Sequence, residues 1–428
     1  MLDVTLIRQH PDRVRDGLRK RGVDVDVPGF LALDAEFRAA RTAVEELRAE
    51  RRRISAAVGA RRRDGDPGEE LQAQAQELTG RLAEADAALR RLAQRHQEFL
   101  DGLPNLPADD VLAGGKEHNQ VVRTVGAPPE LAHPVRDHVT LSEELGLVDH
   151  RRGVRLAGNG YWVYRGEGAA LEWALLNHFL DAHRRAGYEF VLPPHLLTEE
   201  AGYTAGQFPK FADEVFRTGE GGGRRFLLPT AETALVNLHR GETLDERDLP
   251  LKYVAYTPCY RMESGSHRTA ERGTLRGHQF NKVELFQFAR PEDSEAAQLE
   301  LLARAEELVA GLGLHYRVTK LAAKDTSPAQ AKTYDVEVWL PSLGAYAEVS
   351  SVSNAREYQA RRGGIRYRPA GGGRTAYVHT LNASGLATSR LLPAILEQHQ
   401  RPDGTVAVPE VLRHRGLPDV LRPRVTRG

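Results

Sequence analysis

"CYRMESGSHRTAERGTLRGHQF", Cys259–Phe280, joins two segments of the chain that alternate between apolar and polar residues, "LKYVAYTPCYRM" and "HQFNKVELFQF". Such alternation is typical of half-buried β-strands. The quoted stretch contains four arginines, two glutamates, three glycines and two histidines. It therefore predicts a long β-hairpin whose charged connection requires a functional explanation.

The segments around this hairpin also read as short strands and helices. "LEWALLNHFLDAHRRAG" (171–187) has the apolar face and glycine stop of a helix, and the strand "YEFVLPP" follows it. "EVFRT" and "RRFLLPT" read as a second hairpin around "GEGGG" (219–223). Further strand candidates are "YDVEVWLP", "AYAEVSSVSN" and "YVHTLNAS", the last feeding the helix "SGLATSRLLPAILEQHQ". Antiparallel strands with flanking helices predict an α+β domain.

The N-terminal quarter has a different pattern, in which apolar residues recur at alternating spacings of three and four. The first run is Leu33, Phe37, Ala40, Val44, Leu47, Arg51, Ile54 and Val58, and the second is Leu71, Ala75, Leu78, Leu82, Ala85, Leu89, Leu92, His96 and Phe99. This spacing is typical of a coiled coil. The breakers in "DGDPG" between the runs predict an antiparallel two-helix hairpin over residues 30–101, each helix on the order of 50 Å long.

Two arginine triplets lie on the first of these helices. They are Arg51, Arg52 and Arg53, followed by Arg61, Arg62 and Arg63 just before the expected tip. Coiled coils are often structural or mediate dimerisation, but arginines near the tip of a long helical hairpin would contribute little to a dimer interface. They are well placed to contact nucleic-acid phosphates, which give affinity without reading sequence.

Composition limits the class of protein. The chain has 428 residues, 41% hydrophobic content and a formal net charge of zero, which argues against coating nucleic acid by bulk charge. Its one cysteine, Cys259, excludes an internal disulfide and a multi-cysteine zinc site. The N-terminus lacks the apolar core of a signal peptide, and the chain has no 18-residue apolar run. We therefore expect a cytoplasmic protein without a membrane segment.

Charged side chains gather at the ends of the predicted strands. The chain has no GxxxxGK[ST], HExxH or GxSxG motif. The charged and hydroxyl groups at these strand ends are instead Glu232, Arg261, Glu263, Arg276, Glu284, Glu348, Ser350 and Ser351, and Arg390 lies on the last predicted helix. Taken singly, Glu284 on a strand or Arg390 on a helix is equally consistent with an ordinary surface charge. Together, arginines suit phosphate, and carboxylates beside hydroxyls suit an ammonium ion or Mg²⁺.

The order of these segments resembles the bacterial-type seryl-tRNA synthetases, members of the class II aminoacyl-tRNA synthetases. The resemblance covers essentially the whole chain, and several motifs are specific to the seryl branch. They are "GLPNLP", "GQFPKF", "LLPTAE", the opening stretch, "KTYDVEVWLP", "EVSSVSN", "QARR", "VHTLNASGLA" and "DGTVAVPEVLR". The resemblance implies ATP-dependent activation of L-serine to seryl-adenylate and its transfer to tRNA(Ser), with tRNA(Sec) as a possible second acceptor.

The resemblance also implies a domain plan. Residues 1–101 would form the tRNA-binding domain, whose coiled-coil hairpin clasps the tRNA through Arg51, Arg52, Arg53, Arg61, Arg62 and Arg63. Residues 102–135 would be a linker, and residues 136–428 the catalytic domain. Pro193 and Pro194 would end the first class signature, which in this class builds a homodimer interface.

The family's motifs imply roles for particular residues of this chain. Serine would be bound by Thr230, Ala231, Glu232, Glu284, Asn382 and Ser384, with Glu232 on its ammonium and Glu284 and Ser384 on its hydroxyl. ATP would be bound by Arg261, Met262, Glu263, Gly277, Glu348, Val349, Ser350, Ser351 and Arg390. Within this set Arg261, Glu348 and Arg390 would be catalytic, and Glu348 and Ser351 would hold Mg²⁺.

Four features depart from the family's usual pattern. "KDTSP" (324–328) stands where members carry a "GDMGF"-like stretch, and "AGNGYWVY" (157–164) where "SGSRF" is usual. Ser389 replaces a glycine, and Gly277 replaces a larger residue. These changes leave every implied ligand in place but could alter the packing behind the amino-acid pocket, the kinetics or the substrate.

Three functions are compatible with this pattern. The first is housekeeping serine–tRNA ligation. The second is a divergent duplicate, for resistance to a serine-mimicking inhibitor or for supplying seryl-tRNA to a biosynthetic pathway. The third is a catalytically silent tRNA-binding protein, against which the retention of Glu232, Arg261, Glu284, Glu348 and Arg390 argues.

Overall fold

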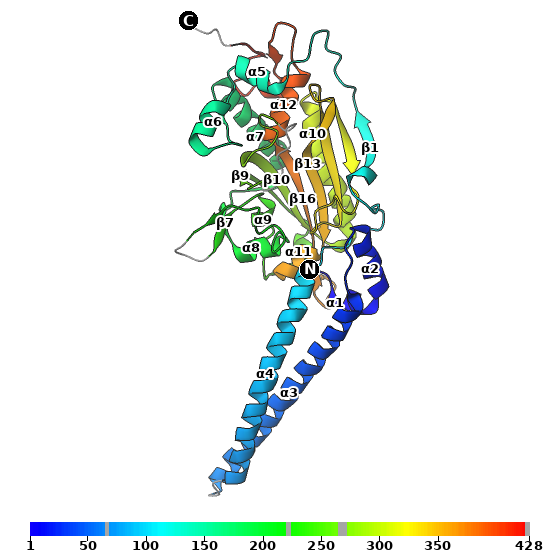
Figure 1. The fold of residues 1–428 in the computed structure, drawn as a ribbon, viewed down its shortest axis with the longest axis vertical. Helices are drawn as coiled ribbons and strands as arrows, with labels where there is room; N and C mark the ends of the chain where they lie inside the picture. The colour runs from blue at the N-terminus through cyan, green and yellow to red at the C-terminus, as the bar shows by residue number, and fades with distance from the viewer. Residues whose placement is uncertain (65–67, 220–223, 264–271, 424–428) are drawn as a thin grey trace. The chain divides into compact units, whose positions relative to one another are not determined.

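The computed structural model describes residues 1–64, 68–219, 224–263 and 272–423. It divides into an N-terminal unit (2–19 and 23–104) and a C-terminal unit, which holds residues 1 and 20–22 and everything from Asn105 on. Parts of the predicted turns "DGDPG" and "GEGGG", and the middle of the opening stretch with Arg268, lie outside the described residues. Figure 1 shows the elements of both units.

The N-terminal unit is helical, as predicted. Short helices α1 (Val4–Gln9) and α2 (Pro11–Lys20) precede two long ones, α3 (Val27–Arg63) and α4 (Glu69–Gly102), which run side by side (Figure 1). Helix α3 begins three residues before the expected boundary because Asp26 caps it, accepting a hydrogen bond from the Gly29 amide. The predicted coiled-coil hairpin is confirmed.

The base of the hairpin is fixed by a buried polar cluster. Asp34 on α3 accepts hydrogen bonds from Arg8 on α1 at 2.7 Å, and it lies 3.1 Å from the Nε2 atom of His96 on α4. The hydrogen bonds from Arg8 lower the pKa of Asp34 to about 2. Further along α3, the six arginines of the two triplets are exposed, including Arg51, which the heptad spacing had placed on the seam.

The C-terminal unit is built on an eight-stranded sheet. In spatial order its strands are β1 (Gln120–Val125), β11 (Tyr316–Lys320), β12 (Lys332–Leu340), β13 (Ala345–Arg356), β16 (His379–Ala387), β10 (Gln279–Ala289), β9 (Leu251–Tyr260) and β4 (Glu189–Val191). All neighbours pair antiparallel except β4 and β9, which are parallel. The opening stretch joins β9 to β10, so the predicted hairpin is confirmed.

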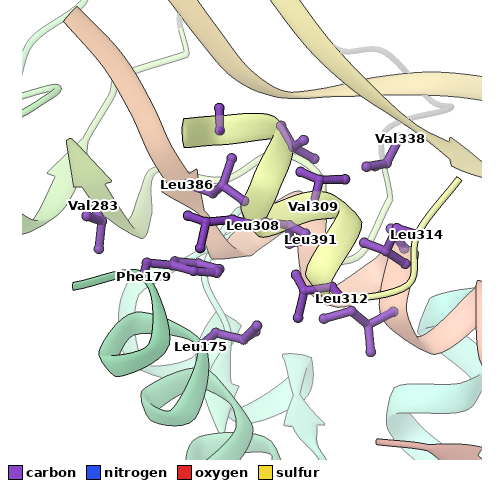
Figure 2. Packing of buried hydrophobic residues seen from close by; sticks show 14 of the residues in the cluster. Leu175, Phe179, Val283, Leu308, Val309, Leu312, Leu314, Val338, Leu386 and Leu391 are labelled. Carbon is purple, nitrogen blue, oxygen red and sulfur yellow. The ribbon is translucent and has the colours of Figure 1, made fainter. Parts of the chain in front are cut away.

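Strand alternation gives this sheet two unlike faces. On β10, Val283 and Leu285 point into the main hydrophobic core, whereas Lys282 and Glu284 point to the opposite face. Three helices supply much of the rest of that core: α7 (Glu167–Arg185), α10 (Ser294–Gly311) and α12 (Thr388–Gln398). Figure 2 shows Phe179 of α7, Leu308 of α10 and Leu391 of α12 packed with strand residues. The helices thus bury one face. The opposite face carries a second buried apolar cluster, which includes Phe286 and Phe288 of β10, beside the polar groups.

Smaller elements surround the sheet. The helices among them are η1 (Lys116–His118), α5 (His138–Glu144), α6 (His150–Ala157), α8 (Glu199–Thr204), α9 (Glu232–Leu235), η2 (Glu246–Asp248), η3 (Pro291–Asp293), α11 (Tyr358–Gly363) and α13 (Glu410–Arg413). The strands are β2 (Val148–Asp149), β3 (Val163–Tyr164), β5 (Leu196–Thr198), β6 (Arg217–Thr218), β7 (Arg225–Leu227), β8 (Thr243–Asp245), β14 (Arg366–Arg368), β15 (Ala376–Tyr377), β17 (Val406–Ala407) and β18 (Val420–Leu421). Strands β5, β7 and β6 form a small sheet of their own.

The segment 102–135 differs from the expected plain linker. It contains β1, which pairs with β11 at the edge of the main sheet. The reason is local: "QVVRTV" has strand-forming residues between flanks that are rich in glycine and proline. Composition averaged over the whole segment concealed this short strand.

None of the described helices is long and apolar enough to cross a membrane. The long helices α3 and α4 instead alternate buried and exposed positions.

Candidate active site

The polar face of the main sheet borders a cavity of about 460 Å³. Alternate residues of β16, Asn382 and Ser384, line it, while the residues that precede them, Leu381 and Ala383, enter the core. Cavities of a few hundred Å³ with convergent polar groups are the usual form of small-molecule sites. The face left free by the three core helices is therefore the candidate active site.

A β-bulge shapes the wall formed by β13. Val336 pairs with Ser350 and the next residue, Glu337, pairs with Glu348, so Val349 is the extra residue. Strict alternation would put Glu348 and Ser351 on opposite faces. The bulge places both beside the cavity, where the Ser351 hydroxyl donates to Asp335 at 2.6 Å and lies 3.3 Å from a Glu348 oxygen.

Most of the predicted site residues lie together. The following line the main cavity: Thr230, Glu232, Arg261, Glu263, Glu348, Ser351, Asn382 and Ser384. A smaller adjoining cavity of about 80 Å³ is also bordered by Arg261, and adds Gly277, Val349 and Arg390. Residues from distant parts of the sequence thus surround one continuous polar region.

Four predicted residues border none of the cavities described above. Ala231 is fully buried, and Met262 is partly exposed beside the site. Ser350 faces away, because its hydroxyl donates to the Ser384 carbonyl oxygen at 2.6 Å. Glu284 is fully buried behind Lys282 and Asn382, which do line the cavity.

Glu284 is held by the two residues in front of it. Lys282 Nζ lies 2.6 Å from one carboxylate oxygen, and Asn382 donates to the other at 3.0 Å. Lys282 also donates to the Thr230 hydroxyl at 2.7 Å. Lys282 was not among the predicted residues, although its position two before Glu284 on a strand signals a shared face. A ligand hydroxyl could approach Glu284 only beside these two side chains.

Glu232 is the carboxylate on the opposite wall. Its Oε1 atom accepts hydrogen bonds from Gln359 at 2.7 Å and from Gln330 at 3.1 Å. Burial and the negative charge of Glu284 raise the pKa of Glu232 to about 7, against the lowering effect of the amides and Lys282. A bound cation would relieve this penalty, so the pair of carboxylates favours an ammonium ligand.

Arginines and a further carboxylate occupy the other end of the site. Arg390 donates to the Glu348 carboxylate at 3.2 Å, and Arg261 lies over the Phe280 ring. Arg276 forms an ion pair with Glu263. Burial disfavours the charged form of Glu348, but Arg390 and Arg261 outweigh it and lower its pKa. This end can bind phosphate through guanidinium groups.

Glu348 and Ser351 also fit a magnesium ion by chemistry. Both offer oxygen ligands, which Mg²⁺ prefers, and they lie next to each other. Among the described residues no group of three or more His, Cys, Asp or Glu side chains is arranged to hold a metal. One carboxylate and a hydroxyl suit an ion that takes its remaining ligands from a polyphosphate and water.

Two departures from the family pattern form one packing unit. A Cβ atom on Gly277 would lie 2.2 Å from the Trp162 ring, so Trp162 fills the space that a larger residue at 277 would need. Likewise, a Cβ on Gly160 would lie 2.6 Å from the His278 ring. The changes in "AGNGYWVY" and at Gly277 therefore compensate each other beside the smaller cavity.

Comparison with known proteins agrees with this geometry. Residues 1–107 match the family model for the seryl-tRNA synthetase N-terminal domain, and residues 216–399 match that for the tRNA synthetase class II core domain (G, H, P, S and T). The chain is 54% identical to serine–tRNA ligase 2 of Clostridium acetobutylicum, over 96% of this chain and 98% of that protein. It is 44% identical to serine–tRNA ligase of Chlorobaculum parvum, with the same coverage.

Solved structures give the same result. The seryl-tRNA synthetase of Pyrococcus horikoshii, complexed with ATP, superimposes with a TM-score of 0.91 at 34% identity, covering 99% of this chain and all of that one. The cytoplasmic serine–tRNA ligase of Naegleria fowleri, in complex with AMP, gives a TM-score of 0.86 at 26% identity, with 99% of each chain covered. The chain belongs to the seryl-tRNA synthetase family.

Proposed function

We propose that this protein activates L-serine with ATP to form seryl-adenylate and transfers the seryl group to tRNA(Ser). The observation that carries this proposal is the charge pattern of one continuous site. Carboxylates Glu232 and Glu284 stand at one end, and Arg261, Arg390 and Glu348 at the other. A zwitterionic amino acid and a polyphosphate need such opposite ends. The relatives' names give no specific support to a divergent duplicate.

Activation needs alignment more than acid–base chemistry. The serine carboxylate is already a nucleophile, so it attacks the α-phosphorus of ATP directly, and pyrophosphate leaves as the P–O bond to the β-phosphate breaks. Arg261 borders both cavities and can neutralise the carboxylate and the α-phosphate together. Glu232 holds the ammonium, Glu263 and Gly277 border the adenine end, and Arg390 binds the departing phosphates.

Glu348 and Ser351 would hold Mg²⁺ together with ATP oxygens. Bound there, magnesium would neutralise part of the negative charge of the phosphates. Before ATP binds, Arg390 forms an ion pair with the Glu348 carboxylate, which keeps that carboxylate ionised and in place. ATP binding would exchange this ion pair for contacts of each partner with the nucleotide.

The second step transfers the acyl group. The terminal ribose hydroxyl of tRNA attacks the seryl carbonyl carbon and passes its proton to a phosphate oxygen of the adenylate. AMP leaves with the pair of electrons from the broken mixed-anhydride bond. The arm formed by α3 and α4 would bind the tRNA through its two exposed arginine triplets. Residues 1–101 thus bind tRNA and residues 136–428 perform catalysis in this proposal.

The proposed enzyme is a cytoplasmic homodimer. Several large apolar side chains are exposed around α7 and β4, near the predicted first signature at Pro193 and Pro194. They are Trp173, Phe190, Leu192 and Leu196. Exposed apolar side chains of this kind favour burial against a second copy.

Glu284→Ala is expected to lower kcat/KM for serine by about 100-fold or more in ATP–pyrophosphate exchange. The change removes the hydroxyl partner and leaves Lys282 and Asn382 without the carboxylate that they contact. The KM for ATP, measured in the same assay, is the internal control and should stay within about twofold. Unchanged serine-dependent exchange would refute the role of Glu284.

The pH profile of kcat/KM for serine should have an acidic limb near pH 7. Glu232, with a pKa of about 7 in the free protein, loses its charge below that pH and cannot pair with the serine ammonium. We expect kcat/KM for serine, at saturating ATP, to fall about tenfold per pH unit below the limb. Once serine is bound, its positive charge lowers the pKa of Glu232, so kcat should fall only at lower pH. Parallel limbs in both parameters would contradict this assignment.

A further inference from the structure

Gln330 lies two residues after "KDTSP" (324–328), a segment in which the chain departs from its family's usual pattern. It is only 4% exposed. Ser327, Ala329 and Gln330 form part of the cavity lining itself, beside Glu232 and Asn382. The departure therefore reaches the amino-acid pocket as well as the packing behind it.

The Gln330 amide joins the two ends of the serine pocket. Its Nε2 group donates to Glu232 Oε1 at 3.1 Å and to Asn382 Oδ1 at 3.3 Å, and Asn382 in turn donates to Glu284 at 3.0 Å. The orientation follows from chemistry, because a flipped amide would turn its oxygen toward two acceptors. Gln330 and Asn382 therefore form a relay of amides between the two carboxylates.

This arrangement costs stability, which indicates a functional role. The Gln330 Oε1 atom is buried without a hydrogen-bond partner, and such an atom is normally disfavoured. Buried Arg21 holds the segment from behind, donating to the carbonyl oxygens of Ala323, Thr326 and Gln330. Asn105 also donates to the Ala329 carbonyl at 3.0 Å. The backbone is thus fixed so that the side chain reaches Glu232.

We propose that Gln330 determines amino-acid specificity in this enzyme. Its side chain narrows the cavity between Glu232 and Asn382. Its two hydrogen bonds fix the position of Glu232, which binds the ammonium group, relative to Asn382 and the hydroxyl-binding Glu284. The inference rests on the proposed function, since it assigns these two ends to serine. Gln330 acts through Glu232 and Asn382, so it is a positioning residue that also sets the size of the pocket.

Two variants distinguish the positioning role of the Gln330 hydrogen bonds from the effect of its side chain on the size of the pocket. Gln330→Met keeps the length of the side chain and removes both donors, so we expect KM for serine to rise about 10-fold to 100-fold, since hydrogen bonds to charged groups are the strong ones. KM for ATP and kcat at saturating serine should change little. The acidic limb of kcat/KM for serine should move to higher pH, because Glu232 loses a donor that favours its ionised form.

Gln330→Ala also opens the pocket. We expect kcat/KM for threonine relative to serine to rise about tenfold or more. Threonine differs from serine by one methyl group, and an enzyme excludes such a group mainly by the size of its pocket. A matched control is Gln298→Met. Gln298 is another buried glutamine with an unpartnered Oε1, but it donates to the carbonyl oxygens of Lys332 and Val352 and does not line the cavity. That variant should leave both amino-acid parameters unchanged.

The test is ATP–pyrophosphate exchange by the full-length protein with each of the twenty amino acids, alongside thermal unfolding. The proposal would be overturned if the Gln330 variants kept the wild-type KM for serine, the wild-type acidic limb and the wild-type ratio of kcat/KM for threonine to that for serine. If Gln298→Met changed these quantities as the Gln330 variants do, general destabilisation would explain the effect. A wild-type preference for another amino acid would overturn the proposed function instead. An altered preference in Gln330→Ala would then still support its role in specificity, and no exchange by the wild type would overturn both.

Discussion

Arg261→Ala is expected to lower kcat/KM for serine-dependent ATP–pyrophosphate exchange by about 1,000-fold or more. Arg261 borders both the cavity that holds Glu232 and the one that holds Arg390. It is placed where the serine carboxylate and the α-phosphate meet, and charge neutralisation at such a point is usually the largest single contribution to a rate. The loss should fall mainly on kcat, because the two anions repel most strongly in the transition state.

Two further variants make this result specific. Arg261→Lys keeps the positive charge but loses the planar fork, and we expect an intermediate loss. Arg317→Ala is the matched control, because Arg317 also lies over an aromatic ring, Tyr346, and pairs with Glu337, yet borders neither of these two cavities. Equal losses in Arg317→Ala and Arg261→Ala would show that general destabilisation, and not catalysis, explains the effect.

Deleting residues 35–97 and closing the gap with a short flexible linker should abolish charging of tRNA(Ser) while sparing seryl-adenylate formation. The deletion removes both arginine triplets and most of α3 and α4. We expect charging to fall by at least about 1,000-fold, and pyrophosphate exchange to stay within about threefold. Both are measured on the same preparation, with the full-length protein beside it.

A substitution series in the full-length protein supports the deletion. Replacing the arginines of the two triplets with alanine should raise the KM for tRNA and weaken its dependence on salt, because fewer phosphates are neutralised. Exchange should be unaffected. A truncated protein that charges tRNA as well as the full-length protein does would refute the role of the arm.

Much of the fold could be predicted from the sequence because its signals are periodic. The spacing of apolar residues in α3 and α4 predicts the hairpin, and alternation predicts β9 and β10. Alternation also indicates that Lys282 shares a face with Glu284, although Lys282 was not among the predicted site residues. The roles of Glu232 and Arg390 came from the resemblance alone, since neither position is distinguished by period or composition.

Other features depend on the fold and could not be read from the sequence. The bulge at Val349, which brings Glu348 and Ser351 to the same face, is set by pairing with β12. Gln330 lies in a loop, where no periodicity assigns a side chain to a face. Its proximity to Glu232, 98 residues away in the sequence, arises only when the segment is fixed beside the sheet.

The central claim is that this protein activates serine with ATP, and ATP–pyrophosphate exchange across all twenty amino acids tests it most directly. The account predicts that L-serine supports exchange, and that alanine, which lacks the hydroxyl, supports it at least about 1,000-fold less well in kcat/KM. Exchange that is absent with serine, or equal with serine and alanine, would contradict the account.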